Sequence, residues 1–159
     1  MKHIKWFVGA MALTFAALTA PAFAADLSIT AASVVKGSNG VVERGTAGAT
    51  VTAGQVVYYD SAAGTWKLAD DNSATVAARS PRGIALHAAS TGQPLTIHKG
   101  GDITIGATLT AGVAYYLSDT PGGICPVADL ATGEYPTIVG IARSASVLRV
   151  QFLESGVAL

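Results

Sequence analysis

The chain has 159 residues, enough for one domain with a sizeable hydrophobic core. It carries ten basic and ten acidic residues, and charged residues make up only 13% of it. The lysines and arginines are scattered along the sequence, which argues against a phosphate-binding surface for nucleic acid.

The first 24 residues have the pattern of a secretory signal peptide. Lys2 and Lys5 form a positive start, an apolar run follows, and Pro21 breaks it just before a small-residue site that predicts cleavage after Ala24. The run is short for a membrane-spanning helix, which needs about 20 apolar residues. Cleavage would leave 135 residues with eight basic and ten acidic side chains, a net charge of −2, and no stable membrane span. The alternative is an uncleaved N-terminal arm.

Residues 25–48 are predicted to form an extended arm or hairpin ahead of a β domain at 49–159. Residues 27–30 alternate apolar and polar side chains, as a half-buried strand does. Two valine pairs flank residues 36–40, which contain Asn39-Gly40, a strong hairpin signal. The segment shows no counterpart later in the sequence, so we expect it to be an attachment or exchange arm. Its candidate interface residues are Leu27, Ile29, Val34, Val35, Val41 and Val42.

The rest of the sequence repeats itself once. Residues 49–59 recur at 107–116 with one residue deleted, 83–85 recur at 140–142, and 95–97 have a looser match at 148–150. Two copies are too few for a solenoid, which needs about three. We therefore expect one compact domain of two pseudo-equivalent units, 49–106 and 107–156, that complete each other's core.

Each copy begins with a Thr-Ala-Gly turn and continues as short strands separated by turn signals every 8–12 residues, the spacing of sandwiches and barrels. No stretch after the leader shows a convincing helical period. The predicted fold is therefore all-β, barrel-like or sandwich-like. The expected strands lie at residues 55–59, 65–68, 83–86 and 94–98 in the first copy, and at 113–117, 137–142 and 147–152 in the second.

Both copies carry a tyrosine pair, Tyr58-Tyr59 and Tyr115-Tyr116. Side chains alternate across a strand, so one tyrosine of each pair should face the core. We expect these two rings and Trp66 to tie the two halves together. The alternative is that the aromatic side chains stack on a sugar.

The sequence predicts no enzyme, no cofactor and no metal site. His87 and His98 lack partners at metal-ligand spacing. His98 should end a strand before a turn at Gly100-Gly101, and the adjacent Asp70 and Asp71 should mark a polar turn. Cys125, the single cysteine, excludes an intramolecular disulfide and is expected to be a buried small hydrophobe.

Most of the chain from about residue 26 onwards resembles small virion proteins of tailed bacteriophages, the capsid decoration (cement) or head-fibre type. The segments that carry this resemblance are Ile29-Thr30-Ala31-Ala32-Ser33-Val34-Val35, Thr52-Ala53-Gly54-Gln55, Trp66-Lys67-Leu68-Ala69-Asp70, Gly83-Ile84-Ala85-Leu86, Gly101-Asp102-Ile103-Thr104-Ile105-Gly106-Ala107 and Tyr115-Tyr116-Leu117-Ser118.

The resemblance implies a β-rich virion protein without an active site. It implies a homo-oligomer, often a trimer, that binds the lattice of the major capsid protein through an arm. The signal-like start departs from this family, because phage capsids assemble in the cytoplasm. The alternative is therefore an exported β domain, periplasmic or at a cell surface, that binds carbohydrate through exposed tyrosines.

Overall fold

A computed structural model describes residues 25–159 of the protein. The predicted signal peptide lies outside these residues. Within them the fold is all-β, as expected, and no helix is long and apolar enough to cross a membrane. The strands are β1 (Val35–Lys36), β2 (Val41–Thr46), β3 (Val56–Asp60), β4 (Thr65–Leu68), β5 (Gly83–Ala85), β6 (Pro94–Thr104), β7 (Ala114–Leu117), β8 (Ile124–Pro126), β9 (Thr137–Ala142) and β10 (Val147–Glu154). Three short 3-10 helices are η1 (Ala31–Ser33), η2 (Val76–Arg79) and η3 (Val127–Asp129).

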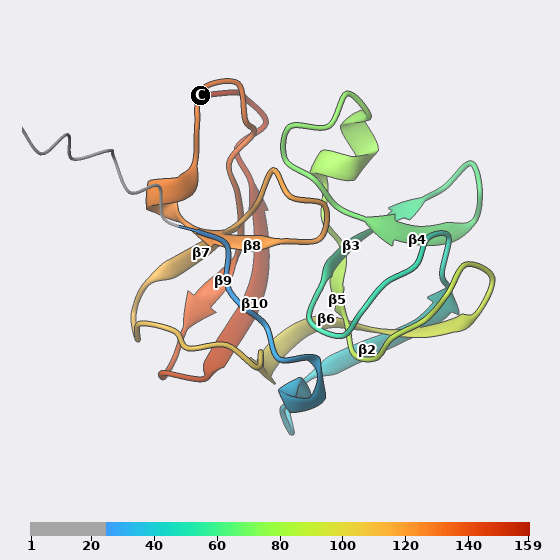
Figure 1. The fold of residues 1–159 in the computed structure, drawn as a ribbon, viewed down its shortest axis with the longest axis horizontal. Coiled ribbons are helices and arrows are strands. Elements are labelled where there is room, and N and C mark those ends of the chain that lie inside the picture. Colours follow the sequence, from blue (N-terminus) through green and yellow to red (C-terminus); the bar gives the residue numbers. More distant parts are fainter. Residues whose placement is uncertain (1–24) are drawn as a thin grey trace, which may run out of the picture.

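All the strands belong to one curled antiparallel sheet. Its order is β4-β3-β5-β6-β10-β9-β7-β8, and β1 and β2 also pair with β6. The first four strands of this order lie on the right in Figure 1, and the last four lie on the left. β6 therefore connects the two halves of the molecule through its own backbone.

The two halves share one pattern of strand pairing. β3 pairs with β4 and β5, and β5 pairs with β6; β7 likewise pairs with β8 and β9, and β9 pairs with β10. The Thr-Ala-Gly turns also match, because Gly54 donates to the carbonyl of Ala85 and Gly112 to that of Ala142, both at 2.8 Å. Both glycines have positive φ, which suits glycine at a turn. Superposition of the two units stays a prediction.

Strand β2 has a counterpart that the sequence prediction missed. β2 pairs with the first part of β6, and the second part of β6 pairs with β10 in the equivalent register. Residues 46–54 and 104–112 are identical at seven of nine positions, so the repeat begins before residue 49. The first part of β6 is thus the last strand of the first unit, and its second part is the first strand of the second unit. The boundary that we predicted at residue 48 cuts through this sheet.

Two local predictions were wrong. Strands β1 and β2 do not pair with each other across Asn39-Gly40; both pair with β6. The Asn39 side chain explains this, because its oxygen accepts from the Asp102 backbone at 3.0 Å and its nitrogen donates to the Asp102 carboxylate at 3.2 Å. Gly100-Gly101 is not a turn either, since β6 continues through it to Thr104 with a bulge opposite β2.

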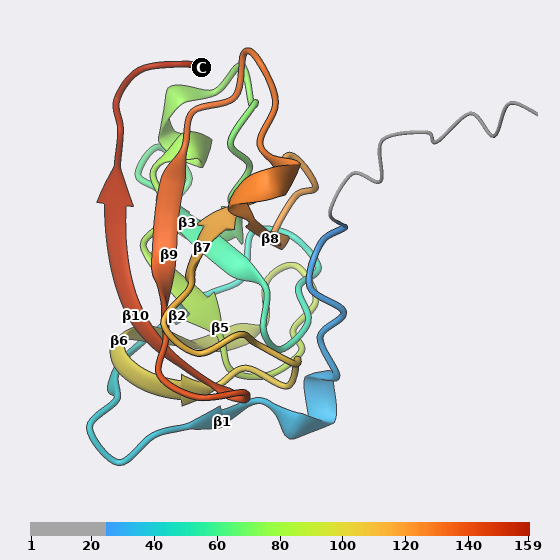
Figure 2. The same cartoon turned by 90° about the vertical axis from the view of Figure 1, so that its left-hand side faces the viewer.

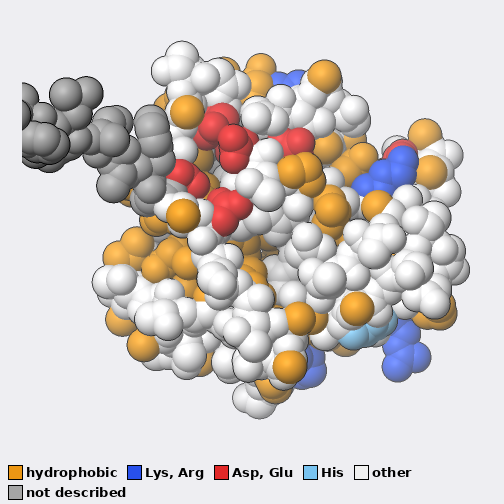
Figure 3. Space-filling view, in the orientation of Figure 1, with side chains coloured by type: hydrophobic (Ala, Val, Ile, Leu, Met, Phe, Trp, Pro, Cys, Tyr) orange, Lys and Arg blue, Asp and Glu red, His pale blue; other side chains and the backbone are white. Residues whose placement is uncertain are grey.

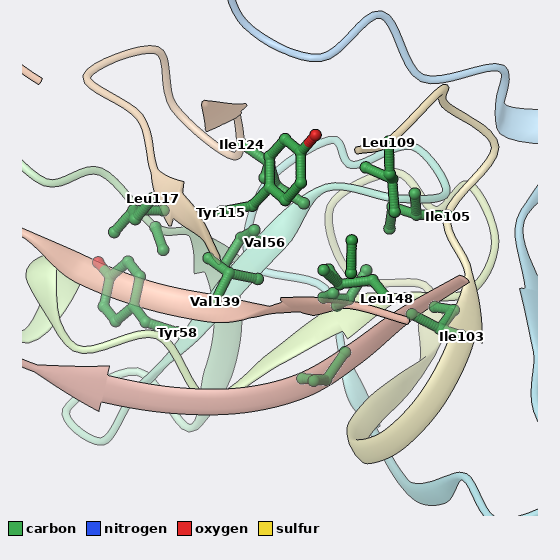
Figure 4. Close-up of a cluster of buried hydrophobic side chains, with 14 of the residues drawn as sticks. Val56, Tyr58, Ile103, Ile105, Leu109, Tyr115, Leu117, Ile124, Val139 and Leu148 are labelled. Atoms are coloured by element: carbon green, nitrogen blue, oxygen red, sulfur yellow. The ribbon is translucent and has the colours of Figure 1, made fainter. Parts of the chain in front are cut away.

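The larger of two core clusters draws buried side chains from both halves (Figure 4). Tyr58 and Tyr115 both belong to it, whereas Tyr59 is 46% exposed, so the expected alternation of the first tyrosine pair is confirmed. Trp66 is also buried, as expected, but it lies in a smaller cluster built from residues of the first half. It therefore does not tie the two halves together.

His98 lies in the middle of β6 and is fully buried. Its Nε2 lies 3.4 Å from the carbonyl oxygen of Gly101, and its Nδ1 has no hydrogen-bond partner. Burial lowers the pKa of His98, and the nearby Lys36 lowers it further, while the Gly101 carbonyl and Asp102 act in the opposite direction. The folded protein therefore keeps this ring neutral.

Replacing Trp66 with alanine should destabilise the protein by about 3–5 kcal/mol, because it empties the centre of the smaller cluster. Thermal unfolding followed by circular dichroism measures the effect. Val127→Ala is the control, since Val127 is 58% exposed and its truncation should change the melting temperature little. Equal melting temperatures for the two variants would contradict the packing role of Trp66.

The neutral His98 should make stability fall as the pH drops below about 6.5, because the unfolded chain then binds a proton that the folded chain resists. The loss from this residue is up to about 1.4 kcal/mol per pH unit. Urea unfolding at pH 7.5, 6.5 and 5.5 measures it. His98→Gln should show a shallower dependence on pH than the wild type. Parallel curves for His98→Gln and wild type would contradict the prediction.

Candidate functional site

The predicted arm divides into two parts in the structure. Leu27, Ile29 and Val34 are half-buried and pack against the larger core cluster of the same chain. The segment 25–34 lies on the opposite side of the molecule from β10 (Figure 2). Its backbone is also held, since Leu27 donates to the carbonyl of Ile124 at 2.8 Å. These three residues are therefore part of the domain in this structure.

The other three arm residues face solvent. Val35, Val41 and Val42 are 58%, 62% and 45% exposed on β1 and β2. These two strands run beside β6, so the outward valines sit on a segment that is already part of the sheet. Of the predicted interface set, these valines are the members that remain available to a partner.

A first surface depression lies in the first half, with a volume of about 460 Å³. Tyr59 and Trp66 form its aromatic wall, with ring centroids 5.4 Å apart and ring planes inclined at 56°. Arg82, Lys99 and Glu43 add charged groups. We call this depression the Tyr59 groove; the sequence pointed to its aromatic residues but not to its charged rim.

The charges of the Tyr59 groove restrict how its aromatic wall can be used. Lys99 forms an ion pair with Glu43 at 3.1 Å, and its ammonium lies 4.6 Å from the centroid of the Trp66 ring. Because that cation covers one face of a ring that is only 2% exposed, Trp66 offers little surface for stacking. Tyr59 is the aromatic side chain that a ligand can reach.

A second surface depression lies in the second half and is apolar. Ile138 of β9 pairs with Tyr116 of β7 on one side and with Leu153 of β10 on the other, so the three form a row across the sheet. They line a depression of about 300 Å³, and Ile138 and Leu153 also line a neighbouring one of about 130 Å³ with Ile141. We define Tyr116, Ile138, Ile141 and Leu153 as the β9 face.

The outward-facing members of the two tyrosine pairs, exposed Tyr59 and half-buried Tyr116, thus line different surfaces. Tyr59 borders a charged groove and Tyr116 borders an apolar face. The apolar character of residues 137–142 is visible in the sequence. That this strand places Ile138 beside Leu153 follows from a β-bulge between Val150 and Leu153, which has no sequence signal that we identified.

The remaining candidate residues do not assemble a catalytic group. The ring nitrogens of His87 contact backbone atoms of Ala88 and Thr96, both at 3.0 Å. Cys125 is 1% exposed, as expected, and burial raises the pKa of its thiol, which opposes formation of a nucleophilic thiolate. Asp71 lies in a turn, as expected, but its side chain is fully buried.

Neither a protein-family model nor a curated protein matches this chain.

Proposed function

We propose that the protein is a structural virion protein that binds and stabilises the surface of a phage capsid as a homo-oligomer. The observation that carries this proposal is the β9 face, where Leu153 and Ile141 are 64% and 48% exposed beside Ile138. The resemblance of residues 26–159 to decoration and head-fibre proteins supports the capsid as the partner, and it favours a trimer.

The β9 face has the composition expected of a surface that a protein covers. Contiguous apolar side chains on solvent-facing strands are costly to hydrate, and such patches commonly mark interfaces. Aromatic and aliphatic residues with few charges also characterise the centres of such interfaces. Glu154 is the one charged residue in the lining of the larger depression. A capsid lattice or a second copy of the chain would remove this apolar surface from water.

The second part of the arm, β1 and β2, supports the same class of function through a different contact. β2 is paired with β6 along one edge and presents Val41 and Val42 to solvent. Strands at the border of a sheet can accept a partner strand. We propose that β1 and β2 contribute a second contact with the lattice or with a neighbouring copy.

Replacing Leu153 with aspartate should dissociate the oligomer or lower capsid binding at least tenfold, because a charge would have to be buried in an apolar contact. Light scattering after size exclusion measures the mass, and cosedimentation with capsids stripped of this protein measures binding. Val76→Asp is the matched control, since Val76 is 70% exposed in the other half. If Leu153→Asp keeps the wild-type mass and capsid binding, the β9 face is not the interface.

A second candidate function is carbohydrate binding at the Tyr59 groove. It is favoured by the accessible Tyr59 ring, which stands beside the polar groups of Ser61, Ser80 and Arg82. Aromatic faces bordered by hydrogen-bonding groups suit the apolar faces and hydroxyls of a sugar. This function would place the protein at a cell surface or in the periplasm.

Tyr59→Ala should abolish retardation of the protein in native gels that contain polysaccharide if the groove binds sugar. Tyr116→Ala is the matched control, because it removes the equivalent tyrosine of the repeat from the apolar face. Equal migration of wild type and both variants with every polysaccharide tested would exclude the carbohydrate function and leave the capsid proposal intact.

A further inference from the structure

Acidic side chains from five separate segments gather on one side of the molecule. Figure 3 shows a red group of acidic side chains close to the start of the described chain, with no blue side chain among them in that view. The segments are the lead-in to η1, the loop after β4, the β7–β8 turn, η3 and the loop before β9. The residues are Asp26, Asp71, Asp119, Asp129 and Glu134.

Asp71 is the residue that a simple surface cluster does not explain. It is fully buried, and neither oxygen of its carboxylate has a hydrogen-bond partner. Its backbone is fixed, because its N–H donates to Ser118 and its carbonyl accepts from Tyr135. Its carboxylate lies close enough to those of Glu134, Asp119 and Asp26 to be repelled by them.

Burying the carboxylate of Asp71 beside other carboxylates costs free energy. Asp71 is removed from water and stands among carboxylates of the same charge, and both conditions disfavour its ionised form. One buried oxygen of Asp26 also lacks a hydrogen-bond partner. Buried carboxylates are normally paired with a cation or hydrogen-bonded. In this cluster, no such partner from the described chain balances the buried oxygens of Asp71 and Asp26.

No lysine or arginine of residues 25–159 forms an ion pair with a carboxylate of this cluster. The ion pairs of these residues join Lys67 to Asp60, Lys99 to Glu43, and two arginines to Asp102. All of these carboxylates lie outside the acidic cluster.

The spacing of the groups matches a shared cation. A carboxylate oxygen of Asp26, one of Asp129 and the sulfur of Cys125 all lie within 4.8 Å of one another. Two oxygens bound to one Ca²⁺ at 2.3–2.6 Å can be at most about 5 Å apart. The atoms are therefore close enough to bind one ion without a large movement of the backbone.

We propose that this cluster holds a Ca²⁺ site, in which Asp26 and Asp129 bind the ion and the buried Asp71 adds negative charge to the cluster. Hard divalent cations prefer carboxylate oxygens, and Ca²⁺ accepts the irregular coordination of a site assembled from several loops. Zn²⁺ fits less well, because the site offers no histidine and a single cysteine. Cys125 is packed as a thiol against the carbonyl of Leu117 at 3.5 Å.

The ion would join parts of the chain that are distant in sequence. Asp26 lies in the segment that precedes η1, and Asp129 lies in η3 of the second half. Ca²⁺ would therefore fasten the N-terminal segment to the second half. This inference is independent of the proposed capsid function.

The test is thermal unfolding of the full chain after treatment with EDTA and dialysis, followed by addition of 1 mM CaCl₂, MgCl₂ or ZnCl₂. We expect CaCl₂ to raise the melting temperature by about 5 °C or more, and calorimetric titration of CaCl₂ to give one site per chain. Asp129→Asn should remove most of the rise. Asp60→Asn is the matched control, because Asp60 pairs with Lys67 away from the cluster, and it should keep the full rise.

Asp71→Asn gives a second readout with the opposite sign. Without metal it should melt at a higher temperature than the wild type, because a buried charge is removed, and it should gain less from CaCl₂. The proposal is overturned if CaCl₂ leaves the wild-type melting temperature unchanged, or if Asp129→Asn responds fully. It is also overturned if only ZnCl₂ stabilises the protein and Cys125→Ala abolishes that effect.

Discussion

The backbone of β6 is the constraint on which the rest of the structure depends. Its first part pairs with β2 and β5, and its second part pairs with β1 and β10, so one strand belongs to both halves. The change of partners occurs at the bulge around Gly100 and Gly101. Gly101 has a φ of +88°, and a Cβ there would collide with the carbonyl oxygen of Asn39. A residue other than glycine at this position would disturb the pairing of both halves at once.

Much of the strand content could be predicted from local pattern, because alternation and turn residues act over a few positions. Residues 65–68 and 137–142 form strands with the predicted limits. The failures occur where the outcome depends on distant partners. Gly100-Gly101 reads locally as a turn, and only the pairing with β2 and β10 makes it a bulge within a strand. Asn39-Gly40 reads as a hairpin, and only its hydrogen bonds to Asp102 show why the flanking strands pair elsewhere.

The buried polar groups could not be predicted for the same reason. Asp70 and Asp71 are adjacent in a polar loop, yet the first is half-buried and the second is fully buried. Nothing within a few residues distinguishes them. Asp71 is enclosed because its backbone bonds to Ser118 and Tyr135, which belong to the second half. The acidic cluster is therefore a property of how the halves are joined.

The two copies of the sequence repeat present different outer surfaces. Tyr59 and Tyr116 occupy equivalent places in the repeat, and each faces outward from its own half. In the first half the surroundings are Lys99, Glu43 and Arg82; in the second they are apolar residues of β9 and β10. The position of Lys99 depends on β6, the strand that both halves share. The bulge in β6 leaves Lys99 as the extra residue opposite β2. One charge of the Tyr59 groove is therefore positioned by the strand that joins the halves. It is consistent with the proposal that one half contacts a partner while the other remains accessible.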